Sequence, residues 1–120
     1  MSQANFNAVD CEGWWEQDGL GRQPMESLQL AFTQGQIRGS GTDIIGPFTF
    51  VGAIAVDGTV AMVKHYLGRH NVEYFGTYDG EGTLSGMWNI HGFRGAWMIR
   101  IGRIDGEANA DEIQVFEPNQ

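Results

Sequence analysis

Hydrophobic and polar residues alternate along most of the chain, and turn-forming residues interrupt this alternation at short intervals. In the run that starts at Pro47, for example, Phe48 and Phe50 fall on one face of an extended chain. Asp57-Gly58 then supplies a two-residue turn signal that is typical of β-hairpins. No segment carries hydrophobic residues at helical spacing over the length of a helix. The pattern therefore predicts short strands joined by hairpins.

The same alternation places strands over eight segments and a loop over residues 18–24. The segments extend to about residue 17 and then cover 25–33, 36–38, 47–56, 59–67, 72–78, 84–90 and 95–103. Gly52 interrupts one of them and predicts a β-bulge. Consecutive hairpins form a meander, whose two exposed edges disappear when the sheet closes. We therefore predict an all-β fold, a single antiparallel up-and-down β-barrel of about eight strands.

One domain accounts for the whole sequence. A length of 120 residues fits one core, which we place over residues 1–120 as a single β-barrel domain. Residues 1–10 form an N-terminal tail in this interpretation. Residues 105–120 form an acidic C-terminal tail, which can dock through an apolar patch at Ile113, Val115 and Phe116.

The charge balance is acidic and narrows the choice of partners. The sequence has 15 Asp and Glu against 7 Lys and Arg, a formal net charge of −8. Nucleic acids and anionic membranes both attract basic patches, so we expect neither as a partner. The single cysteine, Cys11, leaves no disulfide within the sequence. Residues 1–10 show no signal-peptide pattern and no apolar run is long enough for a membrane span, so we expect a cytoplasmic protein.

Gly13-Trp14-Trp15 near the N-terminus resembles the G-x-W motif in the first strand of lipocalins and their calycin relatives. The short, glycine-rich hairpins are similar to the avidin and streptavidin branch. The resemblance implies a barrel with a ligand cup at one end. It also implies that Trp15 closes the floor of the barrel and that Arg100 or Arg103, from the last strand, packs across it. The biotin-contacting residues of avidins have no counterparts that can be carried over, so biotin is not implied.

Five aromatic residues with polar tips lie in the predicted strands: Tyr66, Tyr74, Tyr78, Trp88 and Trp97. Such side chains fill the interior of small barrels. They also form hydrogen-bonding walls of ligand pockets, because a buried hydroxyl or indole N–H needs a partner. Both interpretations stay open, and we take these five as the candidate ligand-binding residues.

No group of residues identifies a reaction. The three histidines lie in one strand and two separate turns, so we predict no metal site and no cofactor. Cys11 has no catalytic motif around it. Asp57 and Asp79 precede glycine, where Asp stabilises tight turns. Asp43 precedes an apolar strand and lacks this hairpin signal, but no partner for it can be named. Catalytic residues therefore remain unknown.

The outward-facing side of several strands is unusually hydrophobic. Val63, Phe75, Met87 and Met98 alternate with the residues that we place inside. Contiguous apolar surface is usually covered, and a two-fold dimer covers it with a single patch. We therefore expect a homo-oligomer, most simply a dimer.

These patterns favour a binding protein over an enzyme. The leading hypothesis is that the barrel binds a small, partly apolar molecule. One alternative is a small barrel enzyme of the isomerase or cyclase type, which would use a Tyr, His or carboxylate in the cup. A third is a ligand-free structural or interaction module with a filled barrel.

Overall fold

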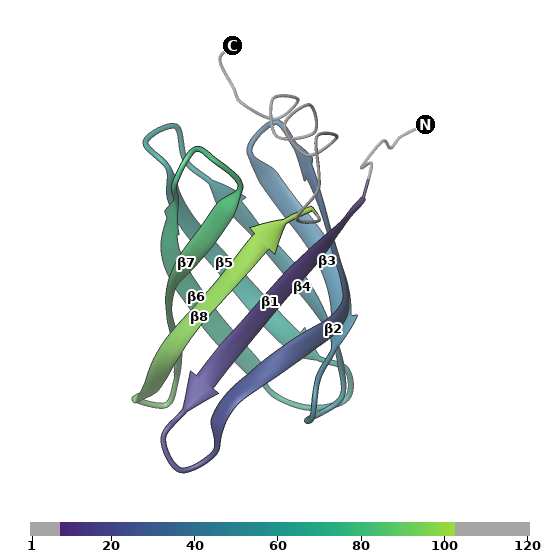
Figure 1. Cartoon of the computed structure of the whole chain (residues 1–120), viewed down its shortest axis with the longest axis vertical. Coiled ribbons are helices and arrows are strands. Elements are labelled where there is room, and N and C mark those ends of the chain that lie inside the picture. The colour runs from purple at the N-terminus through teal and green to yellow at the C-terminus, as the bar shows by residue number, and fades with distance from the viewer. Residues whose placement is uncertain (1–7, 103–120) are drawn as a thin grey trace.

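The computed structural model describes residues 8–102, which form one closed barrel of eight strands. The strands are β1 (Val9–Gln17), β2 (Gly21–Thr33), β3 (Gln36–Thr42), β4 (Pro47–Ile54), β5 (Thr59–Tyr66), β6 (Asn71–Tyr78), β7 (Thr83–Ile90) and β8 (Phe93–Ile101). Each strand is antiparallel to the next, and β8 closes the barrel on β1 (Figure 1). The predicted fold class is confirmed. In residues 8–102, no helix has the length and hydrophobicity that a membrane span requires.

The strand boundaries differ from the prediction near the N-terminus. Residues 9 and 10, which we assigned to a tail, belong to β1 and pair with β2. β2 begins at Gly21, inside the segment that composition predicted as a loop. Gly19 and Gly21 have φ angles of 84° and 86°, which glycine adopts without strain, so a tight turn suffices directly after β1. Residues 105–120, predicted as the C-terminal tail, lie outside the described residues.

Gly52 does not form the predicted β-bulge. It pairs in continuous register with Ile37 on β3 and with Met62 on β5. A Cβ atom at this position would lie 2.2 Å from the carbonyl oxygen of Ala61. Glycine is therefore required for the close approach of two strands. The shifts in register occur in β1 and β2 instead.

The burial pattern of β5 shows which of its faces points into the barrel. Every second residue is buried, and these are Val60, Met62, Lys64 and Tyr66. The residues between them are exposed. Lys64, a charged residue, therefore points into the barrel together with its hydrophobic neighbours on the strand.

Glycines on β6 and β7 make room for a tryptophan in the core. Gly76 pairs with Gly86, which in turn pairs with Trp97 on β8. A Cβ atom at Gly86 would lie 1.9 Å from the carbonyl oxygen of Phe75, so a side chain cannot be added there. That same carbonyl accepts the indole N–H of Trp97 at 3.2 Å. Trp97 is buried and fills the core.

Four hydrophobic side chains form an outer patch on β4 to β7, namely Val51, Val63, Phe75 and Met87. Val51 pairs with Val63 across β4 and β5, and Phe75 pairs with Met87 across β6 and β7. All four are 40–55% exposed. Met98, which we placed on the same face, is half-buried on β8.

Candidate functional site

Lys64, the only lysine in the sequence, lies inside the barrel. It stands between Met62 and Tyr66 in the inward row of β5, and it is fully buried. Burial removes the hydration of an ammonium group, so such a group needs an opposite charge nearby. Asp43 supplies that charge, because its Oδ2 atom lies 2.7 Å from Nζ of Lys64.

Asp43 belongs to the loop between β3 and β4, and its side chain has no exposed surface. Its Oδ2 atom accepts hydrogen bonds from Lys64, from the Tyr66 hydroxyl at 2.7 Å and from the Trp15 indole N–H at 3.0 Å. Its Oδ1 atom accepts the backbone N–H of Ile45 at 2.9 Å, which fixes the turn of the loop. The loop therefore holds a carboxylate inside one end of the barrel.

The ion pair shifts the pKa of both groups. Burial lowers the pKa of Lys64 from 10.5 to about 8, because the hydrogen bond and the charge of Asp43 offset only part of the lost hydration. Burial alone would raise the pKa of Asp43. The hydrogen bond and charge of Lys64, together with the hydrogen bond from Tyr66, lower that pKa below its ordinary value instead. Asp43 is thus ionised at neutral pH.

Aromatic rings surround the ammonium group of Lys64. Its Nζ atom lies 4.2 Å from the ring centre of Phe48 and 4.8 Å from that of Tyr66. The distances are 5.4–5.9 Å to the ring centres of Trp15, Phe50 and Tyr74. Cation–π attraction of this kind supplements the ion pair.

Tyr74 connects the ion pair with the surface of a cavity. Its hydroxyl oxygen accepts a hydrogen bond from Nζ of Lys64 at 3.2 Å. Burial, and then the negative charge of Asp43, raise the pKa of Tyr74 well above 10, so the hydroxyl keeps its proton. An ammonium group only donates hydrogen bonds, so the proton of Tyr74 has to point away from Lys64.

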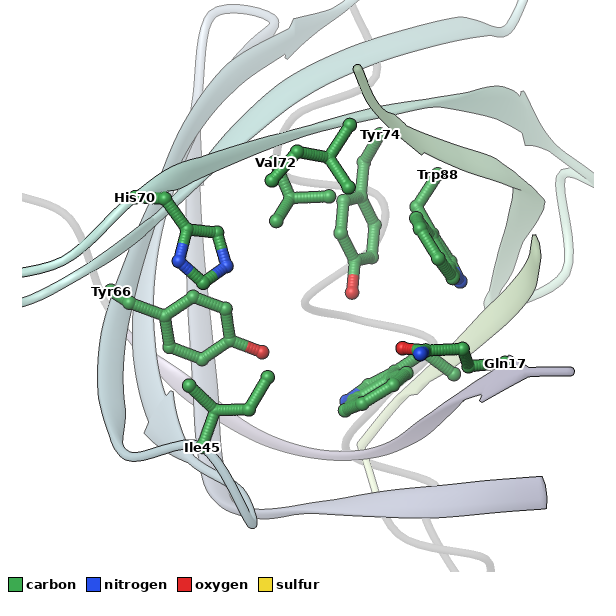
Figure 2. Close-up of a pocket in the computed structure, with 9 residues that line it drawn as sticks. Gln17, Ile45, Tyr66, His70, Val72, Tyr74 and Trp88 are labelled. Atoms are coloured by element: carbon green, nitrogen blue, oxygen red, sulfur yellow. The ribbon is translucent and has the colours of Figure 1, made fainter. Parts of the chain in front are cut away.

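The cavity, with a volume of about 50 Å³, lies at the end of the barrel that carries the Asp43 loop. Most of its wall is aromatic, formed by Trp15, Tyr66, His70, Tyr74 and Trp88, and Gln17 and three aliphatic side chains complete it. Figure 2 shows the hydroxyl groups of Tyr66 and Tyr74 directed toward its centre. Neither Lys64 nor Asp43 lines it. The hydroxyl groups of Tyr66 and Tyr74 therefore face the cavity, and their hydrogen bonds with the Lys64–Asp43 pair behind the wall fix their orientation.

Three of the five candidate ligand-binding residues meet at this cavity: Tyr66, Tyr74 and Trp88. The other two do not. Tyr78 lies at the opposite end of β6, and Trp97 is packed in the core. Alternation along a strand indicates which face is inside, but not how deep in the barrel a residue lies.

Trp15 lies at the cavity, but no arginine packs across it among the described residues. Arg100 is on the outer face of β8, where its guanidinium group lies 3.3 Å from the hydroxyl oxygen of Thr83. Trp15 points inward, so the expected contact with Arg100 is not made. The cation near the Trp15 ring is Lys64, with Nζ 5.5 Å from the ring centre. Arg103 lies outside the described residues.

Sequence reasoning missed Lys64 and assigned no role to Asp43. Two signals were available. Lys64 is the only lysine, and it falls on a hydrophobic row of a strand, where a charge requires a partner. Asp43 is not followed by glycine as Asp57 and Asp79 are, so hairpin formation does not explain it. Together these signals indicate a buried ion pair.

The other reactive side chains lie elsewhere. His65 and His91 are exposed. Cys11 is buried near the start of β1, where burial raises the pKa of its thiol to about 11. Among residues 8–102, no group of three His, Cys, Asp or Glu side chains is placed to hold a metal ion.

Comparison with known proteins adds no relative. No family model matches the chain, and neither a curated protein nor a solved structure matches it. The class of protein is thus defined by the fold and the site alone. It is a closed barrel of eight antiparallel strands with an aromatic cavity at one end and a buried Lys64–Asp43 pair behind the cavity wall.

Proposed function

We propose that the barrel binds a small, partly apolar molecule in the cavity beside Tyr66 and Tyr74. The supporting observation is the composition of the wall, in which aromatic rings surround two hydroxyl groups, as in many small-molecule sites. The volume of about 50 Å³ is smaller than the roughly 300 Å³ at the lower end of typical ligand pockets. The ligand is therefore very small, or it enters with one end only.

We also propose that the chain is a calycin-like barrel, similar in architecture to lipocalins and avidins. The closed meander of eight strands supports this proposal, as does the inward-facing Trp15 of Gly13-Trp14-Trp15. The chain departs from the lipocalin pattern in two respects. Trp15 lines the cavity instead of closing the opposite end of the barrel, and the cation beside it among residues 8–102 is Lys64 from β5.

Mass spectrometry of the small molecules released from purified protein tests the binding proposal without a prior choice of ligand. Val72→Phe enlarges a side chain that lines the cavity. Val56→Phe makes the same change at a position that is 90% exposed. We expect a compound released by the wild type and by Val56→Phe but lost from folded Val72→Phe. Equal release from all three proteins, or release from none, would contradict the proposal.

A filled structural or interaction module is the second candidate function, and the small volume of the cavity favours it. In this case the Lys64–Asp43 pair only organises the end of the barrel. Val72→Phe would then change stability, with no released compound to lose. The wild type, Val72→Phe and Val56→Phe therefore distinguish a ligand-binding barrel from a filled module.

We further propose that two copies of the chain associate through the outer patch. Burying a large aliphatic or aromatic side chain contributes about 1.5–3 kcal/mol, so four exposed ones are a substantial driving force. Val51 pairs with Val63 and Phe75 pairs with Met87, while the exposed Ala61, two residues from Val63 on β5, pairs with Phe75 and links the two pairs. A two-fold axis places the same patch on both copies.

Light scattering measures this association directly. We expect a mass near twice 13.3 kDa for the wild type and a shift toward 13.3 kDa for Phe75→Glu, because the two introduced charges would meet at the interface. Val56→Glu, at an exposed position outside the patch, should leave the mass unchanged. A wild-type mass of 13.3 kDa at micromolar concentration rules out the dimer.

A further inference from the structure

The orientation of the Tyr74 hydroxyl proton determines which ligand the cavity prefers. The Tyr74 oxygen already accepts an N–H from Lys64, and Lys64 has no acceptor to offer in return. The phenol proton is therefore available to a partner on the cavity side, where Figure 2 shows the hydroxyl. A buried donor without an acceptor costs free energy, so a ligand that supplies an acceptor gains affinity.

The ion pair behind the wall leaves no net charge for a ligand to neutralise. Asp43 cancels the charge of Lys64 at 2.7 Å. Its two carboxylate oxygens are already occupied by four donors, from Lys64, Tyr66, Trp15 and Ile45. A charged ligand would lose its hydration on entering, and the Lys64–Asp43 pair would supply no net charge to compensate that loss. Neutral molecules are favoured for this reason.

We propose that the ligand is a small, uncharged molecule with a carbonyl-type oxygen, which accepts the O–H of Tyr74 while the apolar part of the ligand contacts Trp15 and Trp88. This proposal rests on the proposed function and adds the chemical class of the ligand. Lys64 acts as a positioning residue, because it orients the Tyr74 proton without lining the cavity.

Four cyclohexane derivatives of similar size test the proposal. Cyclohexanone carries the acceptor, methylenecyclohexane replaces its oxygen by a CH₂ group, and cyclohexanecarboxylate and cyclohexylammonium carry opposite charges. Binding is followed by NMR through the indole N–H signals of Trp15 and Trp88, which both line the cavity. The protein variants are Tyr74→Phe and the control Tyr78→Phe, on the same strand but away from the cavity.

We expect cyclohexanone to bind the wild type most tightly. Tyr74→Phe should weaken its binding by about 3- to 10-fold, the range of one neutral hydrogen bond, and should not weaken that of methylenecyclohexane. Tyr78→Phe should change neither. Equal affinity of the wild type for cyclohexanone and methylenecyclohexane, or preference for a charged compound, would overturn the inference but leave the proposed function intact. If none of the four compounds shifts the two indole signals, the inference fails, and the proposed function fails with it when the wild type also releases no compound in mass spectrometry. The comparison of compounds on the wild type remains decisive even if Tyr74→Phe does not fold.

Discussion

The two ends of the barrel are built from the same alternating strands but contain different chemistry. At the end where β1 starts and β8 finishes, which we call the closed end, five aliphatic side chains are fully buried: Leu30, Ile37, Val60, Leu84 and Ile99. The other end, which we call the open end, holds the cavity, the aromatic rings around it and the Lys64–Asp43 pair. Aliphatic packing dominates the closed end, whereas the open end has to provide partners for a buried charge and for the hydroxyl groups around it.

This difference indicates where the barrel is specialised. Aliphatic packing gains stability in proportion to the area that it buries. A buried ion pair gains little net stability, because desolvation of the two charges consumes most of their attraction. The Lys64–Asp43 pair is thus poorly explained by stability alone. The pair orients the Tyr66 and Tyr74 hydroxyl groups at the cavity, which gives it a role that a hydrophobic core could not fill.

The largest effect is expected from removal of one charge at the open end. Asp43→Ala leaves the Lys64 ammonium buried without its partner and should lower the free energy of unfolding by about 3–5 kcal/mol. Urea denaturation measures this loss. Asp57→Ala, at an exposed turn carboxylate, is the control and should cost much less.

The double variant Asp43→Ala/Lys64→Met distinguishes a missing partner from a damaged loop. Removing both charges eliminates the unpaired ammonium, so we expect the double variant to be more stable than Asp43→Ala. A double variant that is no more stable than Asp43→Ala would show that the loss arises from the loop and not from the charge.

A smaller loss is expected at the closed end. Leu84→Ala creates a cavity in a fully buried aliphatic layer and should lower the free energy of unfolding by about 2–4 kcal/mol. Because Leu84 lies at the opposite end of β7 from Trp88, the NMR signals of the cavity tryptophans should stay in place. A large shift of these signals would show that the two ends are coupled, and would break the comparison between them.

The fold was predictable from sequence because its signals are local. Asp57-Gly58 marks a hairpin, and Gly58 indeed adopts a φ angle of 92° in the turn. Alternation between such turns gives the strands, and closure follows from the need to remove sheet edges. Gly52 shows the limit, since a glycine in a strand marks a bulge or a close approach, and the sequence does not distinguish the two.

The site was predictable only in part because it depends on contacts between distant segments. Tyr66, Tyr74 and Trp88 are inward-facing by alternation alone. The ion pair also requires the loop after β3 to fold over the end of the barrel, and no local pattern encodes that position. Arg100 could have been excluded as the partner of Trp15 from the sequence, because Ile99 and Ile101 on the inner face already place Arg100 on the outer face.

The last expected effect is a titration at the open end, which needs no substitution. Lys64 is the only lysine, so protein labelled with ¹³C-lysine should give a single lysine Cε signal. Its chemical shift should change with a midpoint near pH 8, because burial lowers the pKa of Lys64 to about 8. In urea the same signal should titrate near the ordinary value of 10.5.

The sign of the accompanying change in stability follows from these two pKa values. Between pH 8 and 10.5 the unfolded chain retains the Lys64 proton while the native protein releases it. The unfolded state therefore binds more protons, and the free energy of unfolding should rise with pH across this window relative to Lys64→Met, which has no such proton. At acid pH the change in stability comes from Asp43, whose pKa is lower in the native state than in the unfolded chain. Its ionised carboxylate stabilises the native state at pH values above the ordinary carboxyl pKa. This contribution is lost as the pH falls through the native pKa of Asp43. A native Lys64 midpoint near 10.5 would mean that water reaches the ammonium group, and the open end would then not contain the buried ion pair that distinguishes it from the closed end.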